Sequence, residues 1–464
     1  MPSIFQRITQ KLGITKEDNA YRLIDISHRL QLPTLTAYAW SLLIDEMEEV
    51  PQNRNSDKRI LIISKSGGLE DVIESLKGEP IDAKVDLISR SVFKKSAHYY
   101  LRDGIGEQNY ITDDPETEKN KIRYRNFLKR VLTTFSERYG CDVIIQFNYF
   151  YTAEREVAAA SSEVGIRFLT AHKECLNSEP IQNYKIERLK DKFGVYEGYK
   201  ISVYNESQKQ VVVQSGFADE SRVNITGCPR VNASHRKREI IPTQGSRTTI
   251  LYYLIHEVAG LPIYKVEENG RTHRGVDKNG RISNWESMIE EVNSTLVNIA
   301  ESNPDLRIIF KAKTGVVRNQ LGNFDIDALP ENIEIVKGGV GHDLLDESHI
   351  VVGFNSTAVL EAMAAGRKTI VPFFKDLLNP ELYPYAIDME DGVTKAETKE
   401  KFKQVLEEAI KDPKIKRTLG PNQIRMLDKY LGNGDGLADE RYRKFIEDAL
   451  YTDPHTVMKL QESK

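Results

Sequence analysis

The chain has 464 residues, which predicts two or three domains because one domain usually holds about 100 to 200 residues. Its 65 Lys and Arg residues nearly balance 69 Asp and Glu residues, so the net charge is -4 at pH 7, and 40% of the residues are hydrophobic. This composition is typical of a soluble globular protein. It excludes a disordered chain and a protein that wraps a polyanion, so we expect no nucleic-acid partner.

Cysteine content and hydropathy indicate where the protein works. Cys141, Cys175 and Cys228 form no C-x-x-C pair and are too few for a disulfide framework, which favours the reducing cytoplasm. The N-terminus has no apolar core of a signal peptide, and no apolar run reaches the length of about eighteen residues that a membrane helix needs. We therefore expect neither secretion nor a membrane span.

Strand and helix patterns alternate through the first half. Residues 20–30 and 35–50 predict two amphipathic helices separated by Pro33. The apolar run at 59–64 leads through a glycine loop into a helical pattern, which makes one α/β unit. Further strands are predicted at 141–147, 166–171, 199–205 and 221–227, and helices at 69–78, 152–165 and 207–217.

A second α/β series follows a polar, basic segment. Residues 233–248 have the composition of a domain linker. Ser283 and Glu286 then form the sequence pattern of a capping box that opens a helix. Strands are predicted at 248–255, 306–312, 333–338, 349–354 and 368–374, and helices at 356–366, 394–413 and 439–450.

These patterns predict an α/β fold of two Rossmann-like domains that face a cleft, with helical extensions at both ends. Residues 1–240 are the predicted N-terminal, acceptor-side domain, and residues 241–400 are the predicted nucleotide-sugar domain. Residues 401–464 are expected to form helices that pack back across the domains.

The stretch 351–372, VVGFNSTAVLEAMAAGRKTIVP, carries the most specific signal. A buried strand ends at Gly353, Asn355 is placed to cap the next helix, and the N–H groups of Ser356 and Thr357 then point out of the sheet's carboxyl edge. Such a helix start attracts phosphate. Glu361, under two turns into the helix, is placed to accept both hydroxyls of a ribose.

These residues, together with the two α/β halves, resemble the donor-binding domain of GT-B glycosyltransferases and of the related UDP-GlcNAc 2-epimerases. The resemblance implies that the helix start holds the phosphate of a nucleotide and that Glu361 holds its ribose. In GT-B enzymes basic side chains and a helix start stabilise the leaving phosphate, so no metal and no cofactor is implied.

Two more segments follow predicted strands and extend the candidate site. His172, Lys173 and Glu174 stand at the carboxyl end of a strand, where open α/β sheets bind ligands. The segment 225–232, ITGCPRVN, is similar to the G-x-P-R-x-D turn of bacterial surface-carbohydrate transferases. Residues 430–441, YLGNGDGLADER, resemble the closing segment of the same proteins.

Position 232 departs from that turn because it holds Asn instead of Asp. In retaining Kdo (3-deoxy-octulosonic acid) transferases, the resemblance implies that the Asp attacks the anomeric carbon and forms a glycosyl-enzyme. An amide oxygen is too weak a nucleophile for this step. Either Asn232 disables the enzyme, or another residue is the nucleophile and the turn has a structural role.

Basic side chains and glycines at other strand ends are the remaining candidate site residues. Lys311 and Lys313 are candidates to neutralise a phosphate or the carboxylate of an acidic sugar, and the GGVGHDLL segment offers a base-binding loop at Gly339 and His342. The Lys-Pro-His-Pro-like segment that Kdo relatives carry there is absent. Gly67 and Gly68, in KSGGL, are candidates for close approach of a substrate, although turns use Gly-Gly routinely.

The resemblance therefore predicts a retaining, metal-independent GT-B glycosyltransferase that moves Kdo from CMP-Kdo to a bacterial surface glycan such as lipopolysaccharide O-antigen or capsule. Asn232 stands at the nucleophile position, Glu174 or His172 is the candidate base, and Arg230, Lys173 or Lys311 pairs with the donor's carboxylate. Expected partners are the nucleotide sugar, a glycan or lipid-linked acceptor, the inner face of the inner membrane and other transferase modules. The alternatives are a UDP-GlcNAc 2-epimerase-like enzyme and a non-catalytic glycan-assembly subunit.

Overall fold

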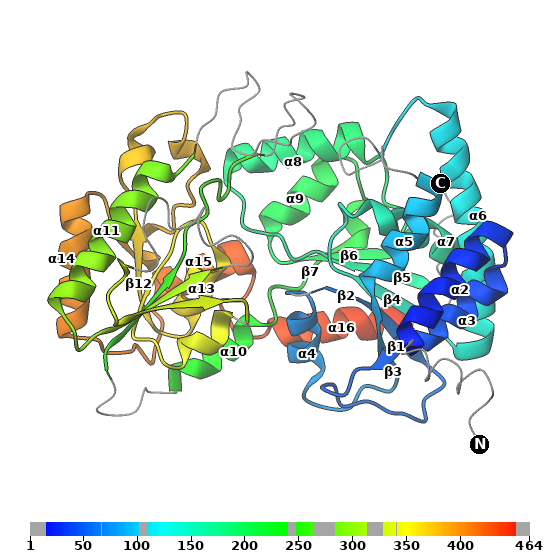
Figure 1. Cartoon of the computed structure of the whole chain (residues 1–464), viewed down its shortest axis with the longest axis horizontal. Coiled ribbons are helices and arrows are strands. Elements are labelled where there is room, and N and C mark those ends of the chain that lie inside the picture. The colour runs from blue at the N-terminus through cyan, green and yellow to red at the C-terminus, as the bar shows by residue number, and fades with distance from the viewer. Residues whose placement is uncertain are drawn as a thin grey trace.

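The computed structural model describes residues 15–65, 67–101, 110–239, 247–262, 284–312, 328–339 and 341–451. Two β-sheets with helices on their faces form the two halves of the molecule (Figure 1). The predicted α/β fold class with two parallel-sheet domains is therefore confirmed.

The first sheet has seven strands in the order β1-β3-β2-β4-β5-β6-β7. All neighbours pair in parallel except β1, which runs antiparallel to β3. Its strands are β1 (Ile44–Glu46), β2 (Arg59–Ser64), β3 (Lys84–Ser89), β4 (Val143–Gln146), β5 (Arg167–Ala171), β6 (Lys200–Val203) and β7 (Val223–Ile225).

Both faces of this sheet are buried, because side chains alternate between them along each strand. Leu61 and Ile63 enter one apolar core, and Ile60 and Ile62 enter another on the opposite face. The helices of this half are α2 (Lys16–Leu30), α3 (Pro33–Leu42), α4 (Leu69–Leu76), α5 (Arg90–Leu101), α6 (Pro115–Tyr139), α7 (Arg155–Glu163), α8 (Glu179–Lys192) and α9 (Glu206–Gln214).

The second sheet has six parallel strands in the order β10-β9-β8-β11-β12-β13, which is the strand order of a Rossmann fold. Its strands are β8 (Thr249–Tyr253), β9 (Arg307–Ala312), β10 (Ile333–Lys337), β11 (Ile350–Val352), β12 (Lys368–Pro372) and β13 (Thr394–Ala396). The helices of the second half are α11 (Glu286–Ser302), α13 (Thr357–Ala364), α14 (Lys399–Lys411) and α15 (Pro421–Leu431), whereas α16 (Ala438–Tyr451) packs in the first half.

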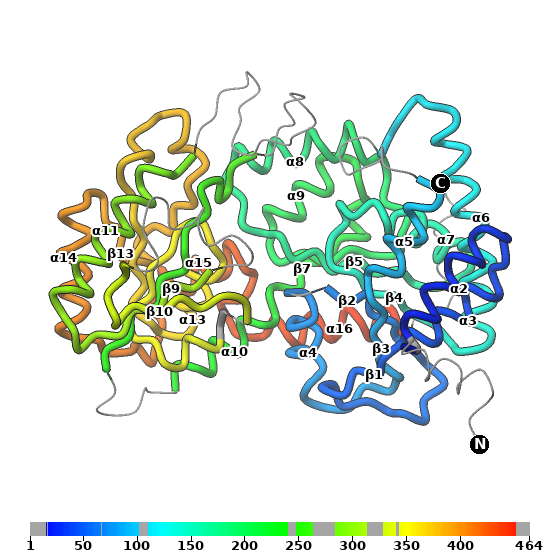
Figure 2. Tube along the Cα trace, in the orientation of Figure 1, coloured from blue at the N-terminus to red at the C-terminus, as the bar shows by residue number. Residues whose placement is uncertain are grey.

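The chain passes between the halves twice. After β7 it enters α10 (Val231–Arg236), which packs against α13, and after α15 it returns in α16, which packs on α4 of the first half (Figures 1 and 2). The two crossings touch at glycines, because a Cβ on Gly227 would lie 2.3 Å from the carbonyl oxygen of Gly432. Backbone therefore meets backbone where the halves are joined.

Three local predictions were wrong. The helix predicted over 35–50 ends at Leu42, and β1 follows it as an edge strand. The helix predicted over 394–413 begins only at Lys399, because Thr394–Ala396 form the strand β13. The helix α11 begins at Glu286 after an N-cap at Trp285, so Glu286 is not the third residue of a capping box, and Ser283 lies outside the described residues.

The segment 233–248, predicted as a linker, lies between the last strand of the first sheet and the first strand of the second. It begins within α10, and its part 240–246 lies outside the described residues.

Candidate active site

In open α/β sheets ligands bind at the carboxyl ends of the strands where the strand order reverses. The order of the first sheet reverses between β2 and β4. The loop after β2 contains Gly67, whose φ of 79° favours glycine, and Gly68, where a Cβ would lie 2.2 Å from the ring of Phe147 after β4. Glycine is therefore required for the backbone to lie on that ring.

The order of the second sheet reverses between β8 and β11, and β11 leads into α13. Ser356 is the N-cap, and its hydroxyl accepts from the N–H of Ala358 at 3.3 Å. The prediction that Asn355 caps this helix is wrong. Asn355 adopts a left-handed φ of 47° and donates to the carbonyls of Ala259 and Tyr385, so it fixes the turn against two neighbouring loops. The N-terminus of α13 from Ser356 to Ala358 is half-buried.

Arg230 connects the two reversal points. Its Nη1 donates to the Tyr204 hydroxyl at 2.8 Å, to Asp71 at 3.2 Å and to the carbonyl of Gly67 at 3.3 Å. Its Nε lies 3.4 Å from Oε1 of Glu361 in α13. One guanidinium thus holds groups from the loop after β2, the end of β6 and the helix after β11.

Charged groups around this guanidinium have shifted pKa values. Burial raises the pKa of Asp71, and the opposing attraction of Arg230 is the smaller effect. Burial lowers the pKa of Lys173, Glu174 opposes that shift, and the nearby positive charge of Arg230 lowers the pKa further. Lys173 lies over the glycine loop, since a Cβ on Gly67 would be 2.8 Å from its Nζ.

The structure therefore brings together four residues that the sequence singled out, namely Gly67, Lys173, Arg230 and Glu361. It adds two partners that sequence reasoning missed. Asp71 stands just after the Gly-Gly pair, and Tyr204 stands at the end of β6, a position that strand-end reasoning also favours. Their hydrogen bond to each other completes the cluster, in which the Tyr204 hydroxyl donates to Asp71.

The other two strand-end candidates are placed differently. His172 is fully buried and stacks on Tyr149 with ring centroids 3.9 Å apart, and neither of its ring nitrogens has a hydrogen-bond partner among the described residues. Burial lowers its pKa well below the usual value. Glu174 is exposed and accepts from Asn148 at 3.2 Å. Of the two candidate bases, only Glu174 can meet an acceptor hydroxyl without a rearrangement.

Asn232 points away from this cluster, toward the second crossing. Its Nδ2 donates to the carbonyl of Gly436 at 2.6 Å, and its Oδ1 accepts from Asn433 at 2.6 Å. The side chain is buried, and both of its polar atoms are occupied. These contacts are those of a structural residue; attack on a sugar would require their release.

The basic and glycine-rich strand ends of the second sheet form a separate group. Lys311 is buried and donates to the carbonyls of Ala312 at 2.9 Å and Gly338 at 2.6 Å. Gly339 has a φ of 70° and open space around it. Lys313 and the side chain of His342 lie outside the described residues.

Within the described ranges no group of three or more His, Cys, Asp or Glu residues is arranged to hold a metal ion. Over the same part of the chain, no helix combines the length and the apolar character needed to cross a membrane.

No family model matches the sequence, and no curated protein is significantly similar to it. A UDP-GlcNAc 2-epimerase structure from Methanocaldococcus jannaschii is 15% identical with a TM-score of 0.46, over 84% of this chain and 99% of that one. A glycosyltransferase from Rickettsia africae is 13% identical with a TM-score of 0.42, over 86% and 100%. An α,α-trehalose 6-phosphate synthase from Burkholderia multivorans is 11% identical with a TM-score of 0.44, over 88% and 98%.

Proposed function

We propose that the chain is a glycosyltransferase that takes a sugar from a nucleotide donor bound at the start of α13. The observation that carries the proposal is the link through Arg230 between the two reversal points, each at the carboxyl ends of parallel strands. Two Rossmann-type sheets joined at these points offer one site for a nucleotide and one for a second substrate. This is the GT-B arrangement.

The residues divide into two roles. The N–H groups of Ser356 and Thr357 at the capped helix start bind the donor phosphate, and the helix dipole favours its negative charge. Glu361, one turn further on, accepts from the ribose, while Arg230 neutralises its charge. Lys173 and Arg230 take up the charge that develops as the nucleotide leaves.

We further propose Kdo from CMP-Kdo as the donor and a bacterial surface glycan as the acceptor, at the cytoplasmic face of the inner membrane. The departing nucleotide is then CMP, and Lys173 or Arg230 also pairs with the carboxylate of Kdo. Glu174 is the base for the acceptor hydroxyl, because His172 is buried. The contacts of Asn232 favour its structural role, so retention through a residue other than Asn232 is part of the proposal.

Those same contacts favour a second candidate, a UDP-GlcNAc 2-epimerase-like enzyme, since epimerisation needs no nucleophile at position 232. The two candidates differ in the nucleotide that they bind and in the product that they form. A non-catalytic assembly subunit is the third case and forms no product.

Thermal unfolding with CMP, CDP and UDP tests the donor site first, because a ligand of the folded state raises the Tm. Incubation with CMP-Kdo or UDP-GlcNAc, followed by chromatography of nucleotides and sugars, then tests the reaction. A transferase of the proposed type is stabilised by CMP and releases CMP from CMP-Kdo, faster with acceptor present. Conversion of UDP-GlcNAc to its epimer would replace the proposal with the second candidate, and failure of every nucleotide to bind would refute both enzymes.

A further inference from the structure

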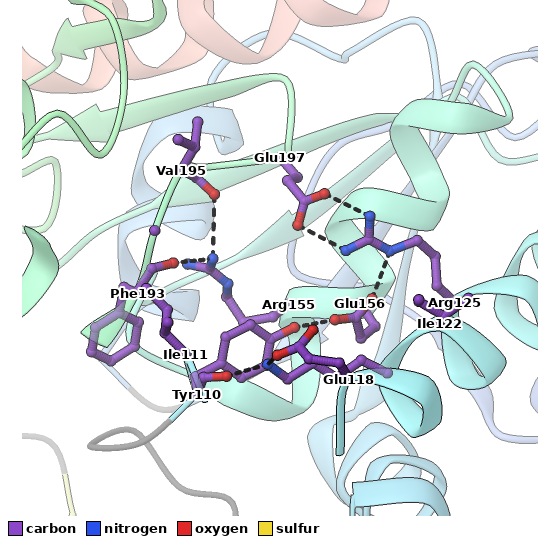
Figure 3. Close-up of a pocket in the computed structure, with 12 residues that line it drawn as sticks. Tyr110, Ile111, Glu118, Ile122, Arg125, Arg155, Glu156, Phe193, Val195 and Glu197 are labelled. Carbon is purple, nitrogen blue, oxygen red and sulfur yellow. Dashed lines mark hydrogen bonds and ion pairs between the residues drawn. The ribbon is translucent and has the colours of Figure 1, made fainter. Parts of the chain in front are cut away.

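Buried polar groups in the first half of the molecule form two separate sets. One set lines a cavity of about 460 Å³, in which Arg125 donates to Glu156 and Glu197 and the Tyr110 hydroxyl donates to Glu156 (Figure 3). These groups satisfy one another, and no candidate site residue lines the cavity. The second set surrounds the loop 172–178 after β5, which carries Glu174, and it is therefore the set that bears on the proposed reaction.

A buried amide of this second set holds the carboxylate of Glu174. Asn148 follows β4, the strand next to β5, and is 3% exposed. Its Nδ2 donates to Oε1 of Glu174 at 3.2 Å, and its Oδ1 accepts from the backbone N–H of Phe150 at 2.8 Å. The second bond fixes which side of the amide carries the N–H groups, so the donor must face Glu174.

This contact occupies one carboxylate oxygen of Glu174 and leaves the other open. Glu174 is exposed, and its Oε2 has no hydrogen-bond partner among the described residues. An exposed glutamate samples several rotamers, and a hydrogen bond to one oxygen restricts them. A general base must lie within hydrogen-bond reach of the proton that it accepts. Asn148 therefore limits the directions in which Oε2 can point.

Asn205, the N-cap of α9, holds the backbone of the same loop. Its Nδ2 donates to the carbonyl of Cys175, the residue after Glu174, at 3.2 Å and to the carbonyl of Tyr430 in α15 at 2.6 Å. Asn205 is buried, so both bonds are shielded from water. The backbone next to Glu174 is thus tied to the start of α9 and to the second half of the molecule.

Side chains of α8 and α9 hold the loop at further points. Lys185 donates to the carbonyl of Glu174 at 3.4 Å and to Oδ1 of Asn177 at 2.7 Å. Nδ2 of Asn177 in turn donates to Gln208 at 2.7 Å, and both of these amides are buried. Because the backbone of the loop is fixed in this way, the remaining freedom of Glu174 lies in its side chain, which Asn148 holds.

We propose that Asn148 is a positioning residue, which aims Oε2 of Glu174 at the hydroxyl of the acceptor. This inference rests on the proposed function, in which Glu174 is the base. Asn148 acts through Glu174 and not on the donor, which binds at the start of α13. Loss of the Asn148 donor should therefore lower kcat and leave the KM for CMP-Kdo and the affinity for CMP nearly unchanged.

The rate of CMP release from CMP-Kdo tests this role, with octyl β-galactoside as the acceptor probe and with water as the acceptor in its absence. Asn148→Asp has the same shape and keeps the acceptor for Phe150, but it lacks the donor to Glu174, so kcat should fall at least tenfold. Asn148→Ser is the uncharged second variant. Its hydroxyl can accept from Phe150 but is too short to reach Glu174, so kcat should fall likewise.

The matched control is Asn332→Asp, which removes a half-buried amide donor in the second half and should keep the wild-type kcat. Circular dichroism and the Tm shift with CMP show whether each variant is folded and binds nucleotide. A double-mutant cycle then separates positioning from loss of structure. In the Glu174→Gln background the base is absent, so Asn148→Asp should change kcat by less than about twofold.

The inference is overturned if the kcat of Asn148→Asp matches that of Asn332→Asp, or if Asn148→Asp raises KM and leaves kcat unchanged. It is also overturned if Asn148→Asp lowers kcat by the same factor with and without Glu174→Gln. If the wild type releases no CMP, the proposed function fails and this inference fails with it. Release of CMP by the wild type, with equal effects of Asn148→Asp in both backgrounds, overturns this inference alone.

Discussion

Arg230, at the first crossing, pairs through Nε with Oε1 of Glu361 in α13 at 3.4 Å. The same guanidinium pairs with Asp71 in α4 at 3.2 Å, and all three side chains are at least partly withdrawn from solvent. An arginine between two buried carboxylates from different halves ties the position of α13 to that of the glycine loop. The geometry of the proposed site therefore depends on this one cation.

Replacement of this cation should destabilise the fold strongly. Arg230→Met leaves Asp71 and Glu361 without their shared partner, and breaking a buried ion pair from one side costs about 3–5 kcal/mol. We expect a lower urea midpoint for the chain. Arg54→Met is the control, because Arg54 pairs with Glu46 on the surface, where such pairs contribute about 0–1 kcal/mol. Equal midpoints for both variants would show that the Arg230 cluster is not a structural tie.

The role of the start of α13 in nucleotide binding can be tested by comparing Asp with Asn at position 357, which have the same shape and differ in charge. Thr357→Asp adds a carboxylate at the first helical residue, where the helix dipole favours it, so the free protein should keep or slightly gain stability. The same charge repels a bound phosphate, and nucleotide affinity should fall at least tenfold. Thr357→Asn, which has the same shape without the charge, should bind nucleotide much as the wild type does. Equal nucleotide affinity in the two variants would remove this helix start from the donor site.

The structural role of Asn232 can be tested by the pH dependence of stability in a variant. Asn232→Asp removes the amide N–H that donates to the carbonyl of Gly436 and places a carboxylate oxygen against that carbonyl. The free energy of unfolding should fall by about 1–3 kcal/mol. Because the carboxyl lacks that donor, its pKa in the folded state is raised, and stability should recover as pH falls and the group regains a proton. We expect urea midpoints nearer the wild type at pH 5 than at pH 8, and no gain in sugar transfer. A gain in transfer would instead identify position 232 as a disabled nucleophile.

The strands were predictable where both faces of the sheet are buried. Runs such as Ile60–Ile63 are unbroken and apolar because helices cover both sides. The strand β3 had no predicted counterpart, since Asp86 interrupts its apolar pattern and pairs with Arg59 at 3.1 Å. A charged residue inside a strand therefore breaks the apolar pattern by which strands are predicted, even when a neighbouring strand neutralises its charge.

The site was predictable only in part, because its decisive contacts join distant segments. Strand-end reasoning placed Lys173 and Gly67 at carboxyl edges, and the structure brings them together. The partner Asp71 lies 159 positions from Arg230, and no local pattern connects the two. The contacts of Asn232 with Asn433 and Gly436 arise from the second crossing, for which the sequence gave only a family resemblance at 430–441 and no pairing with position 232.

A buried histidine should make stability depend on pH. His28 stacks among Tyr99, Tyr100 and Phe127, and burial lowers its pKa from 6.5 to about 4. The unfolded chain then binds more protons between pH 6.5 and pH 4, so stability falls as the pH falls through that window, by at most about 3 kcal/mol. Urea midpoints of the wild type should drop over this range more steeply than those of His28→Phe. Parallel curves would contradict this assignment.

The last prediction concerns Gly432, where the second crossing lies against the end of β6 in the first half. Gly432 has a φ of 56°, and a Cβ there would lie 1.9 Å from the carbonyl oxygen of Tyr204. Gly216 has a similar φ of 70° with open space around it, so Gly216→Ala measures backbone strain alone, about 1 kcal/mol. Gly432→Ala adds overpacking against backbone and should cost about 2–4 kcal/mol in total. Urea midpoints compare the two variants. If they unfold alike, the close approach of Gly432 to the end of β6 does not hold the halves together; a larger loss for Gly432→Ala means that it does.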